Sequence, residues 1–335
     1  MTPPSNLATR SPSGPVVVLG PQRLRPTLRD AVAGLDRFDP GTAHYAVVTA
    51  GWEEREKEHA ELAAHLGGRT TNLDLRERAE DVFQRDPDLF GALLAHHDRL
   101  KQLQELYRVR LAHALDAART LLARERAEDE PELVELARTA AIDDVRDLDA
   151  RHFGSLQEMH AAFEAEWKPT ERDAVAAHRE ELARILGDSS ALCVAGGHVR
   201  ILLNRLRLFD LVPLAGDRPI FCWSAGAMAL AERIVVFHDS PPQGAGDAEV
   251  IDAGLGLLQG LVPLPHASRR LRLDDPVRVG LFARRFGPAL CAALDEGARV
   301  DWNDGRWQAS PGTLALQEDG SLAPLNGDSA GEVAQ

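Results

Sequence analysis

Short apolar runs that end at glycine or at a polar residue recur near both ends of the chain. They cover Val16–Gly20, Tyr45–Ala50, Ala191–Ala195, Pro219–Trp223 and Ile234–Phe237. Continuous apolar runs of this length, without alternation, are typical of strands that are buried on both faces of a parallel sheet. A weaker run at Thr71–Leu75 predicts one more strand.

Amphipathic patterns lie between these runs and predict helices that flank the sheet. Such patterns cover Trp52–Leu66, His198–Phe209 and Ala225–Glu232. We therefore expect an α/β fold with a mostly parallel sheet covered by helices.

Residues 81–187 follow a different pattern. From Ala92 to Phe153 there is no glycine, and Pro131 is the one proline. Apolar positions recur every three or four residues, as helices require, at Leu93, Leu100, Leu103, Tyr107, Leu111 and Leu115. We expect three to five long helices here, with Pro131 opening one of them.

The simplest organisation is an α/β domain built from 15–80 and 188–325 and interrupted by an all-α insertion at 81–187. Three independent domains are the alternative. We prefer the insertion, because 15–80 alone has too few strands to close a core. The polar residues 1–14 and 326–335 are expected to be disordered tails.

Composition narrows the classes of function. The net charge of −14 opposes nucleic-acid binding. No apolar run is long enough to span a membrane, and no signal peptide is evident, so we expect a cytoplasmic protein without a membrane partner. The three cysteines form no CxxC pair, and the histidines show no HxxxH spacing, so neither a metal site nor a cofactor is implied.

Candidate chemistry gathers around Ser224. The string Cys222-Trp223-Ser224-Ala225-Gly226 stands where a strand passes into a helix, which is the context of a nucleophile elbow. A serine nucleophile needs a base and a carboxylate that orients the base. His266 and Asp239 both follow apolar segments downstream and are the candidates. An ordinary strand–helix turn is the alternative reading of the string.

Other groups could complete such a site. Gly196, Gly197 and Ala225 could offer backbone N–H groups to an oxyanion. Arg269 and Arg270 follow the candidate base and could bind a substrate carboxylate, although solvent-exposed arginines would look the same in sequence. Cys222 is expected to be a packing residue, since it precedes the nucleophile position by two residues.

These residues resemble the peptidase E (aspartyl dipeptidase) and cyanophycinase family. The family's G-x-S-A-G-A elbow is similar to Cys222–Ala227, and its Gly-Gly-Asn turn is similar to 196–198. Further matches are Thr49–Arg55, Asp239-Ser240-Pro241, Gly254–His266, Asp295-Glu296-Gly297 with Val300, and Asp304-Gly305. Cys222 replaces the elbow glycine, His198 replaces the asparagine, and 81–187 has no counterpart in the family.

The resemblance implies a class I glutamine amidotransferase-like (flavodoxin-like) fold and a serine peptidase. It implies Ser224 as nucleophile, His266 as base and Asp239 as the orienting acid, with His198 near the substrate. The expected substrate is a small peptide, with Asp at the scissile position as one option, and a homodimer is one option for assembly. A non-catalytic member whose insertion binds a protein partner, and an ordinary α/β-hydrolase esterase, remain the alternatives.

Overall fold

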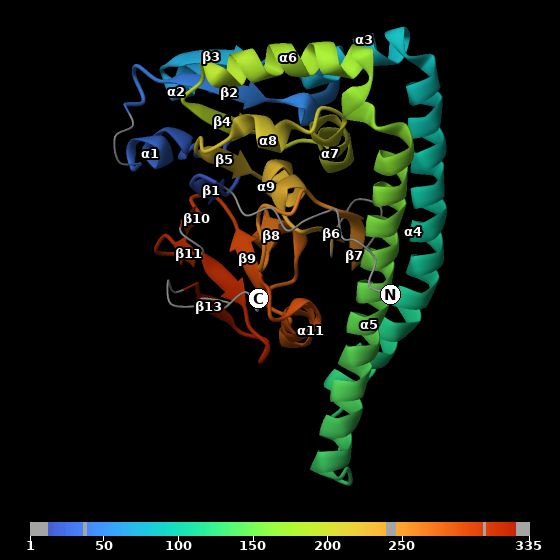
Figure 1. Cartoon of the computed structure of the whole chain (residues 1–335). Helices are drawn as coiled ribbons and strands as arrows, with labels where there is room; N and C mark the ends of the chain where they lie inside the picture. The colour runs from blue at the N-terminus through green and yellow to red at the C-terminus, as the bar shows by residue number, and fades with distance from the viewer. Residues whose placement is uncertain (1–12, 36–38, 239–245, 304–305, 326–335) are drawn as a thin grey trace.

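The computed structural model describes residues 13–35, 39–238, 246–303 and 306–325. Most of the two expected tails, and Asp239 with the residues up to 245, lie outside this description. Figure 1 shows an α/β body with a long helical hairpin along one side. Among the described residues, no helix is both long and apolar enough to cross a membrane.

A seven-stranded sheet forms the centre of the body, and the predicted α/β class is confirmed. The strand order is β11-β10-β1-β5-β4-β2-β3. Five neighbouring strands are parallel, and β10 and β11 extend the sheet in antiparallel fashion. The strands are β1 (Val16–Leu19), β2 (His44–Val48), β3 (Arg69–Asn72), β4 (Ala191–Val194), β5 (Ile220–Trp223), β10 (Arg299–Asn303) and β11 (Arg306–Ala309).

Helices cover both faces of this sheet, which explains why its strands read as unbroken apolar runs. One face packs on α1 (Leu28–Ala33) and α2 (Ala60–Leu66). The other face packs on a larger set of helices. These are α3 (Leu75–Arg85), α6 (Asp173–Gly187), α7 (Val199–Leu208), α8 (Leu211–Ala215) and α9 (Ala225–Leu230).

The single helix predicted over Trp52–Leu66 is wrong. A short 3-10 helix, η1, covers Ala50–Arg55, and α2 begins only at Ala60. Tertiary hydrogen bonds fix the chain between the two, because Thr49 Oγ1 and Asn72 Nδ2 donate to the Glu56 carbonyl at 2.7 and 2.8 Å. These bonds outweigh the helical periodicity of the segment. The expected strand at Thr71–Leu75 begins two residues earlier, as β3.

Between β3 and β4 the chain is helical. After α3 come α4 (Pro87–Leu122), α5 (Pro131–Trp167), a 3-10 turn η2 (Pro169–Glu171) and α6. Prolines stand at the first position of α4 and α5, where their missing N–H costs nothing. The two long helices form an antiparallel hairpin whose tip projects beyond the body (Figure 1). The last helix, α6, returns to the body and packs on the central sheet.

Buried polar groups fasten this hairpin to the body. Tyr107 OH donates to Asp149 at 2.7 Å, and Arg285 of the body donates twice to the same carboxylate, at 2.6 and 2.9 Å. Both charged side chains are almost fully buried. Each of these two buried charges would be costly without the other, and the ion pair neutralises both.

Histidines form the second group of contacts. His96 lies 3.1 Å from His160, whose Nε2 in turn lies 2.7 Å from the Asp252 carboxylate of the body. His152 Nε2 lies 3.0 Å from the Val250 carbonyl. These side chains are buried, as packing histidines, and no group of three or more metal-ligating side chains occurs among the described residues.

A smaller region after α9 carries the remaining strands. The ribbon of β6 (Arg233–His238) and β7 (Gly246–Ala253) is antiparallel, and β8 pairs with β9 in parallel. Trp302 and Trp307 pack against each other across β10 and β11, with ring centroids 4.7 Å apart and ring planes tilted by 51°. The other elements are β8 (Leu261–Pro265), α10 (Ala267–Arg270), α11 (Pro276–Phe286), β9 (Leu290–Leu294), β12 (Leu314–Leu316) and β13 (Leu322–Pro324).

Candidate active site

Ser224 is held on a sharp turn between β5 and α9. Its backbone has φ 50° and ψ −121°, a conformation that residues with a side chain rarely adopt. The turn needs small neighbours, because a Cβ on Gly226 would lie 2.3 Å from the Val194 carbonyl oxygen. A strained, partly exposed serine between a buried strand and a helix is the geometry of a nucleophile elbow.

The Gly196-Gly197 turn lies directly against this serine. A Cβ on Gly196 would fall 2.8 Å from Ser224 Cβ and 3.5 Å from its Oγ. Gly197 has φ 115° and packs on the carbonyl of Gly51. Within the described residues, the N–H groups of Gly197 and Ala225 donate no backbone hydrogen bond, so both are available to an oxyanion.

His198 has a structural contact of its own. Its backbone N–H donates to the Gly51 carbonyl at 2.7 Å, which fixes the turn against η1. Its ring Nδ1 accepts from the Ile201 N–H at 3.4 Å and caps the first turn of α7. His198 therefore caps this helix with its own side chain.

His266 follows β8 and opens the short helix α10. Its backbone is left-handed, with φ 58° and ψ 37°, and its N–H donates to the Leu294 carbonyl at 3.1 Å. Burial lowers the pKa of His266 from its ordinary value, and the charges of Arg270 and Arg269 lower it further. A half-buried imidazole that is neutral at pH 7 is suited to act as a base.

The elements of Ser224 and His266 are in contact, although the two side chains share no hydrogen bond. Helix α9, which Ser224 opens, packs on β8, at whose end His266 stands. Both residues are described, and no bond joins Ser224 Oγ to the imidazole. Catalytic contacts of this kind are often loose until substrate binds. That the two side chains come within hydrogen-bonding reach stays a prediction.

Two carboxylates, Asp295 and Glu296, lie near His266. Asp295 and Glu296 follow β9, and the parallel pairing of Pro265 with Leu294 brings them beside the histidine. Both carboxylates act to raise the pKa of His266. Asp239 lies outside the described residues. The signal in the sequence was the position of Asp295 directly after an apolar run, as at His266.

These two carboxylates have further contacts. Asp295 Oδ1 accepts from the N–H and from the hydroxyl of Ser268, at 3.1 and 2.9 Å. Glu296 pairs with Arg269 at 3.5 Å. Asp295 is thereby fixed to the same short helix that His266 opens, which suits a group that orients the histidine.

The structure distinguishes the two candidate arginines. The Arg269 side chain is 65% exposed and bound to Glu296. Arg270 is half-buried, burial lowers its pKa, and it forms no ion pair within the described residues. Its charge reaches His266 and also His238 at the end of β6, lowering the pKa of both histidines. Of the two, Arg270 is therefore the less exposed guanidinium, and the one without an ion pair among the described residues.

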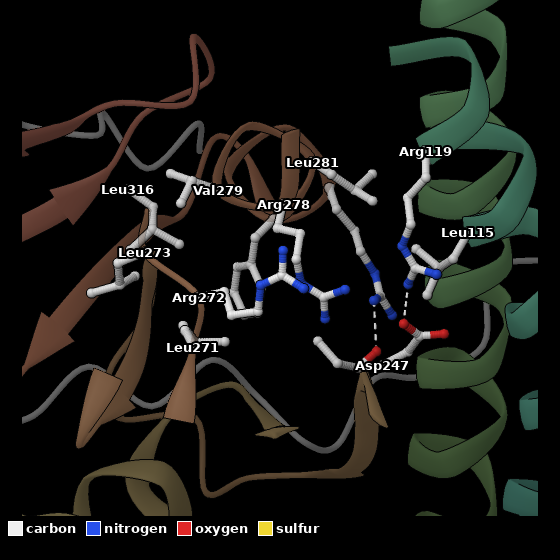
Figure 2. A pocket seen from close by; sticks show the side chains of 13 residues that line it. Leu115, Arg119, Asp247, Leu271, Arg272, Leu273, Arg278, Val279, Leu281 and Leu316 are labelled. Atoms are coloured by element: carbon white, nitrogen blue, oxygen red, sulfur yellow. Dashed lines mark hydrogen bonds and ion pairs between the residues drawn. The ribbon is translucent and has the colours of Figure 1, made fainter. Parts of the chain in front are cut away.

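Two surface pockets include residues of the segment that follows α10, and neither is lined by Ser224 or His266. One lies between α4 and α11 beside Leu271 and Leu273, and the other includes Asp295 and Glu296. Figure 2 shows the first pocket, in which Arg119 of α4 binds Asp247 of β7. The neighbouring Arg285 is held by Asp149 and by the Ala248 carbonyl. Two of its arginines thus serve to join the hairpin to the body.

Cys222 is fully buried in β5, as expected for a packing residue. Burial raises the pKa of its thiol well above the ordinary range. A buried thiol of this kind is unreactive. Of Cys222 and Ser224, only the serine is partly exposed.

No family model and no curated protein matches this chain. Among solved structures, a peptidase from an acI-B1 Actinobacterium is similar over 91% of this chain and 91% of its own, with 12% identity and a TM-score of 0.44. A provisionally named peptidase E from Listeria monocytogenes EGD-e is similar over 89% of this chain and 98% of its own, with 9% identity and a TM-score of 0.42. At these TM-scores neither similarity bears on what this chain does.

Proposed function

We propose that the protein is a serine hydrolase that cleaves a small peptide through an acyl-enzyme on Ser224. The observation that carries this proposal is the strained backbone of Ser224, with Gly196 packed against its side chain. A residue held in such a backbone conformation costs about 1–3 kcal/mol and persists only where the surrounding structure enforces it. Residues of this kind cluster at active sites. The family resemblance of the elbow, the glycine turn and the histidine segment points the same way.

In this proposal the Ser224 hydroxyl attacks the scissile carbonyl while His266 takes its proton. The N–H groups of Gly197 and Ala225 donate to the oxyanion that forms. His266 then gives the proton to the leaving amine, and the C–N bond breaks. Water, deprotonated by His266, releases the acyl group and restores the serine.

A carboxylate is needed to hold the imidazole in its working tautomer. The resemblance implies Asp239 for this role, whereas Asp295 and Glu296 are described carboxylates whose charges raise the pKa of His266. We favour the latter pair, since the parallel pairing of β8 with β9 brings both beside the histidine. Asp239→Asn, Asp295→Asn and Glu296→Gln, compared for peptide hydrolysis, distinguish the three.

The proposal also commits to an anionic group on the substrate, bound by Arg270. A half-buried guanidinium without an ion pair among the described residues has lost part of its hydration and gains most from a bound carboxylate. A peptide with an aspartate near the scissile bond supplies one.

Labelling by a fluorophosphonate probe tests the proposal. The wild type should be labelled at Ser224, and Ser224→Ala should not. Ser321→Ala is the matched control, because Ser321 is an exposed serine in the turn between β12 and β13 and has no role in the proposed site. Labelling that survives in Ser224→Ala, or that never occurs in a folded wild type, would rule out the serine hydrolase and favour a binding protein. A panel of dipeptides and esters then separates a peptidase from an esterase.

A further inference from the structure

The outer edge of β7 is covered by side chains instead of by another strand. Within the described residues β7 pairs with β6 alone, in a sheet of two strands. On its other side the Val250 N–H donates to the Tyr107 hydroxyl oxygen at 3.4 Å, and the Val250 carbonyl accepts from His152 Nε2 at 3.0 Å. The Ala248 carbonyl accepts from Arg285 at 2.7 Å. Because Tyr107 belongs to α4 and His152 to α5, the hairpin supplies hydrogen-bond partners that a neighbouring strand would otherwise supply.

Polar groups hold the hairpin against β7. Asp247 of β7 pairs with Arg119 of α4, and Glu249 pairs with Arg108 at 2.7 Å. The apolar residues between α4 and α5 instead pack mainly on each other, and Leu281 is the one body residue in their buried cluster. An opening between the hairpin and β7 therefore exposes little apolar surface, and it costs less than unfolding of the whole chain.

The outer end of this contact is not filled. A pocket of about 500 Å³, part of it open to solvent, lies between α4, the start of β7 and α11. Figure 2 shows the Arg119–Asp247 pair at this pocket, with Leu115 of α4 and Leu281 of α11 beside it. Side chains that border a gap lose packing contacts on that side, so the hairpin is held less firmly here than a filled interface would hold it.

Two buried histidines of the hairpin, His96 and His160, lie at this contact. His160 Nε2 lies 2.7 Å from Asp252 of β7 and 2.8 Å from Arg207 of α7, and its Nδ1 lies 3.1 Å from His96 Nε2. His97 of α4 also lies near the pair. A proton on either histidine adds a positive charge beside the Arg207 guanidinium, and the Asp252 carboxylate is already paired with that guanidinium at 3.3 Å.

A third buried histidine, His152, stacks on the Tyr107 ring with centroids 3.9 Å apart. Its Nε2 donates to the Val250 carbonyl, so a further proton has to bind at Nδ1. This Nδ1 is buried and has no partner among the described residues. Protonation would thus create a buried N–H without an acceptor, which is costly. The charged groups near His152 are Asp149, Glu249, Asp252 and, across Tyr107, Arg285.

Protons therefore favour an open hairpin. Burial is the first cause that lowers the pKa of all three histidines from 6.5, and it brings that of His96 to about 4. A histidine that reaches water when the hairpin opens regains its ordinary pKa, so opening takes up protons. By linkage, the open form gains as the pH falls below 6.5.

We propose that the hairpin is a proton-sensitive cover of the β7 edge, which opens locally in acid before the central sheet unfolds. Opening frees the outward backbone groups of Ala248 and Val250, which are the groups that an added strand would bind. This inference goes beyond the proposed hydrolase activity and does not depend on it.

Native-state hydrogen exchange at the amides of Val250 in β7 and Phe221 in β5 tests the cover. Protection factors are compared, because they remove the intrinsic pH dependence of exchange. Val250 should be less protected than Phe221, and low concentrations of urea should hardly change its exchange, since local opening exposes little surface. Between pH 7 and pH 5 the protection of Val250 should fall roughly twentyfold, the change expected for a histidine whose pKa rises from about 4 to 6.5 on opening.

Variants identify the groups that respond. His96→Gln and His160→Gln should each reduce the effect of pH on Val250, whereas His113→Gln, at an exposed position of α4, should keep it. Tyr107→Phe removes the acceptor of the Val250 N–H and should lower the protection of Val250 at every pH. Tyr45→Phe is the matched control, because the Tyr45 hydroxyl donates to the Pro40 carbonyl, away from β7.

Three results would overturn the proposal. The first is a Val250 amide that is as protected as Phe221 at every urea concentration, because the hairpin then opens only when the chain unfolds. The second is a protection factor that is the same at pH 7 and pH 5. The third is a pH effect that both His96→Gln and His160→Gln keep in full.

Discussion

Gly196 and Ser224 are packed so closely that a single methyl group cannot be placed between them: a Cβ on Gly196 would fall 2.8 Å from Ser224 Cβ. The glycine turn and the elbow belong to adjacent parallel strands, β4 and β5, whose carboxyl ends meet at the same edge of the sheet. The contact therefore leaves no room for a side chain at position 196.

Gly196→Ala should abolish most of the activity and leave the protein folded. The new methyl group must displace Ser224 or the turn, and a shift of about 1 Å at a nucleophile can cost about a hundredfold in rate. The measurement is kcat/KM on the best substrate, with thermal unfolding as the check on folding. Gly154→Ala is the control, since a Cβ there meets nothing within 4 Å. Equal activity in both variants would contradict the proposed oxyanion turn.

Activity should depend on a neutral His266. Because its pKa is lowered from 6.5, the acid limb of the kcat/KM profile should have its midpoint below that value. Asp295 and Glu296 act to raise this pKa, so Asp295→Asn and Glu296→Gln should each move the midpoint to lower pH. If the midpoint of the acid limb is the same in both variants as in the wild type, neither carboxylate interacts with His266 during the reaction.

Much of the α/β body could be predicted from sequence because its signals are local. The buried strands β1, β4 and β5 are continuous apolar runs, and the elbow follows from one strand–turn–helix string. The placement of Asp295 beside His266 could not be predicted. It depends on the parallel pairing of β8 with β9, and no local pattern specifies that register. The contact of Arg119 with Asp247 likewise joins residues 128 positions apart.

Removal of one partner of the buried Asp149–Arg285 pair should lower the free energy of unfolding strongly, because the other charge then stays buried alone. Asp149→Ala leaves a buried guanidinium without its counter-charge, which costs about 3–5 kcal/mol. Asp147→Ala is the matched control two residues away, because the Asp147–Arg151 pair is exposed and contributes less than about 1 kcal/mol. Urea unfolding of both variants gives the two values. Similar losses would show that the hairpin does not depend on this pair.

The histidine contact between the hairpin and the body should weaken in acid. Burial lowers the pKa of His96 to about 4, and His160, His97 and Arg207 lower it as well, while Asp252 acts against them. The folded pKa lies below the unfolded value of 6.5, so protonation favours the unfolded chain. Stability from this group is complete above pH 6.5 and is lost as the pH falls towards 4, by up to about 3 kcal/mol.

The measurement is the free energy of unfolding between pH 7 and pH 4, in the wild type and in His96→Gln. The variant should be less stable at pH 7, where it loses part of the contact with His160, and the gap should narrow in acid. His113→Gln, at an exposed position of the same helix, controls for a change of histidine alone. Parallel pH curves for wild type and His96→Gln would exclude His96 as the source.

Substrate preference should depend on Arg270 and not on Arg269. A charge-assisted contact to a half-buried arginine contributes about 1.5–3 kcal/mol, which is roughly a tenfold to hundredfold preference for an aspartyl over an asparaginyl peptide. Arg270→Ala should erase this preference and leave slow general hydrolysis, because Ser224 and His266 remain. Arg269→Ala should change it little, since that side chain is exposed and already bound to Glu296. The ratio of kcat/KM for the two peptides, measured in each variant, decides between them. If the preference survives Arg270→Ala, another group binds the substrate carboxylate. If it is lost only in Arg269→Ala, Arg269 and not Arg270 binds that carboxylate.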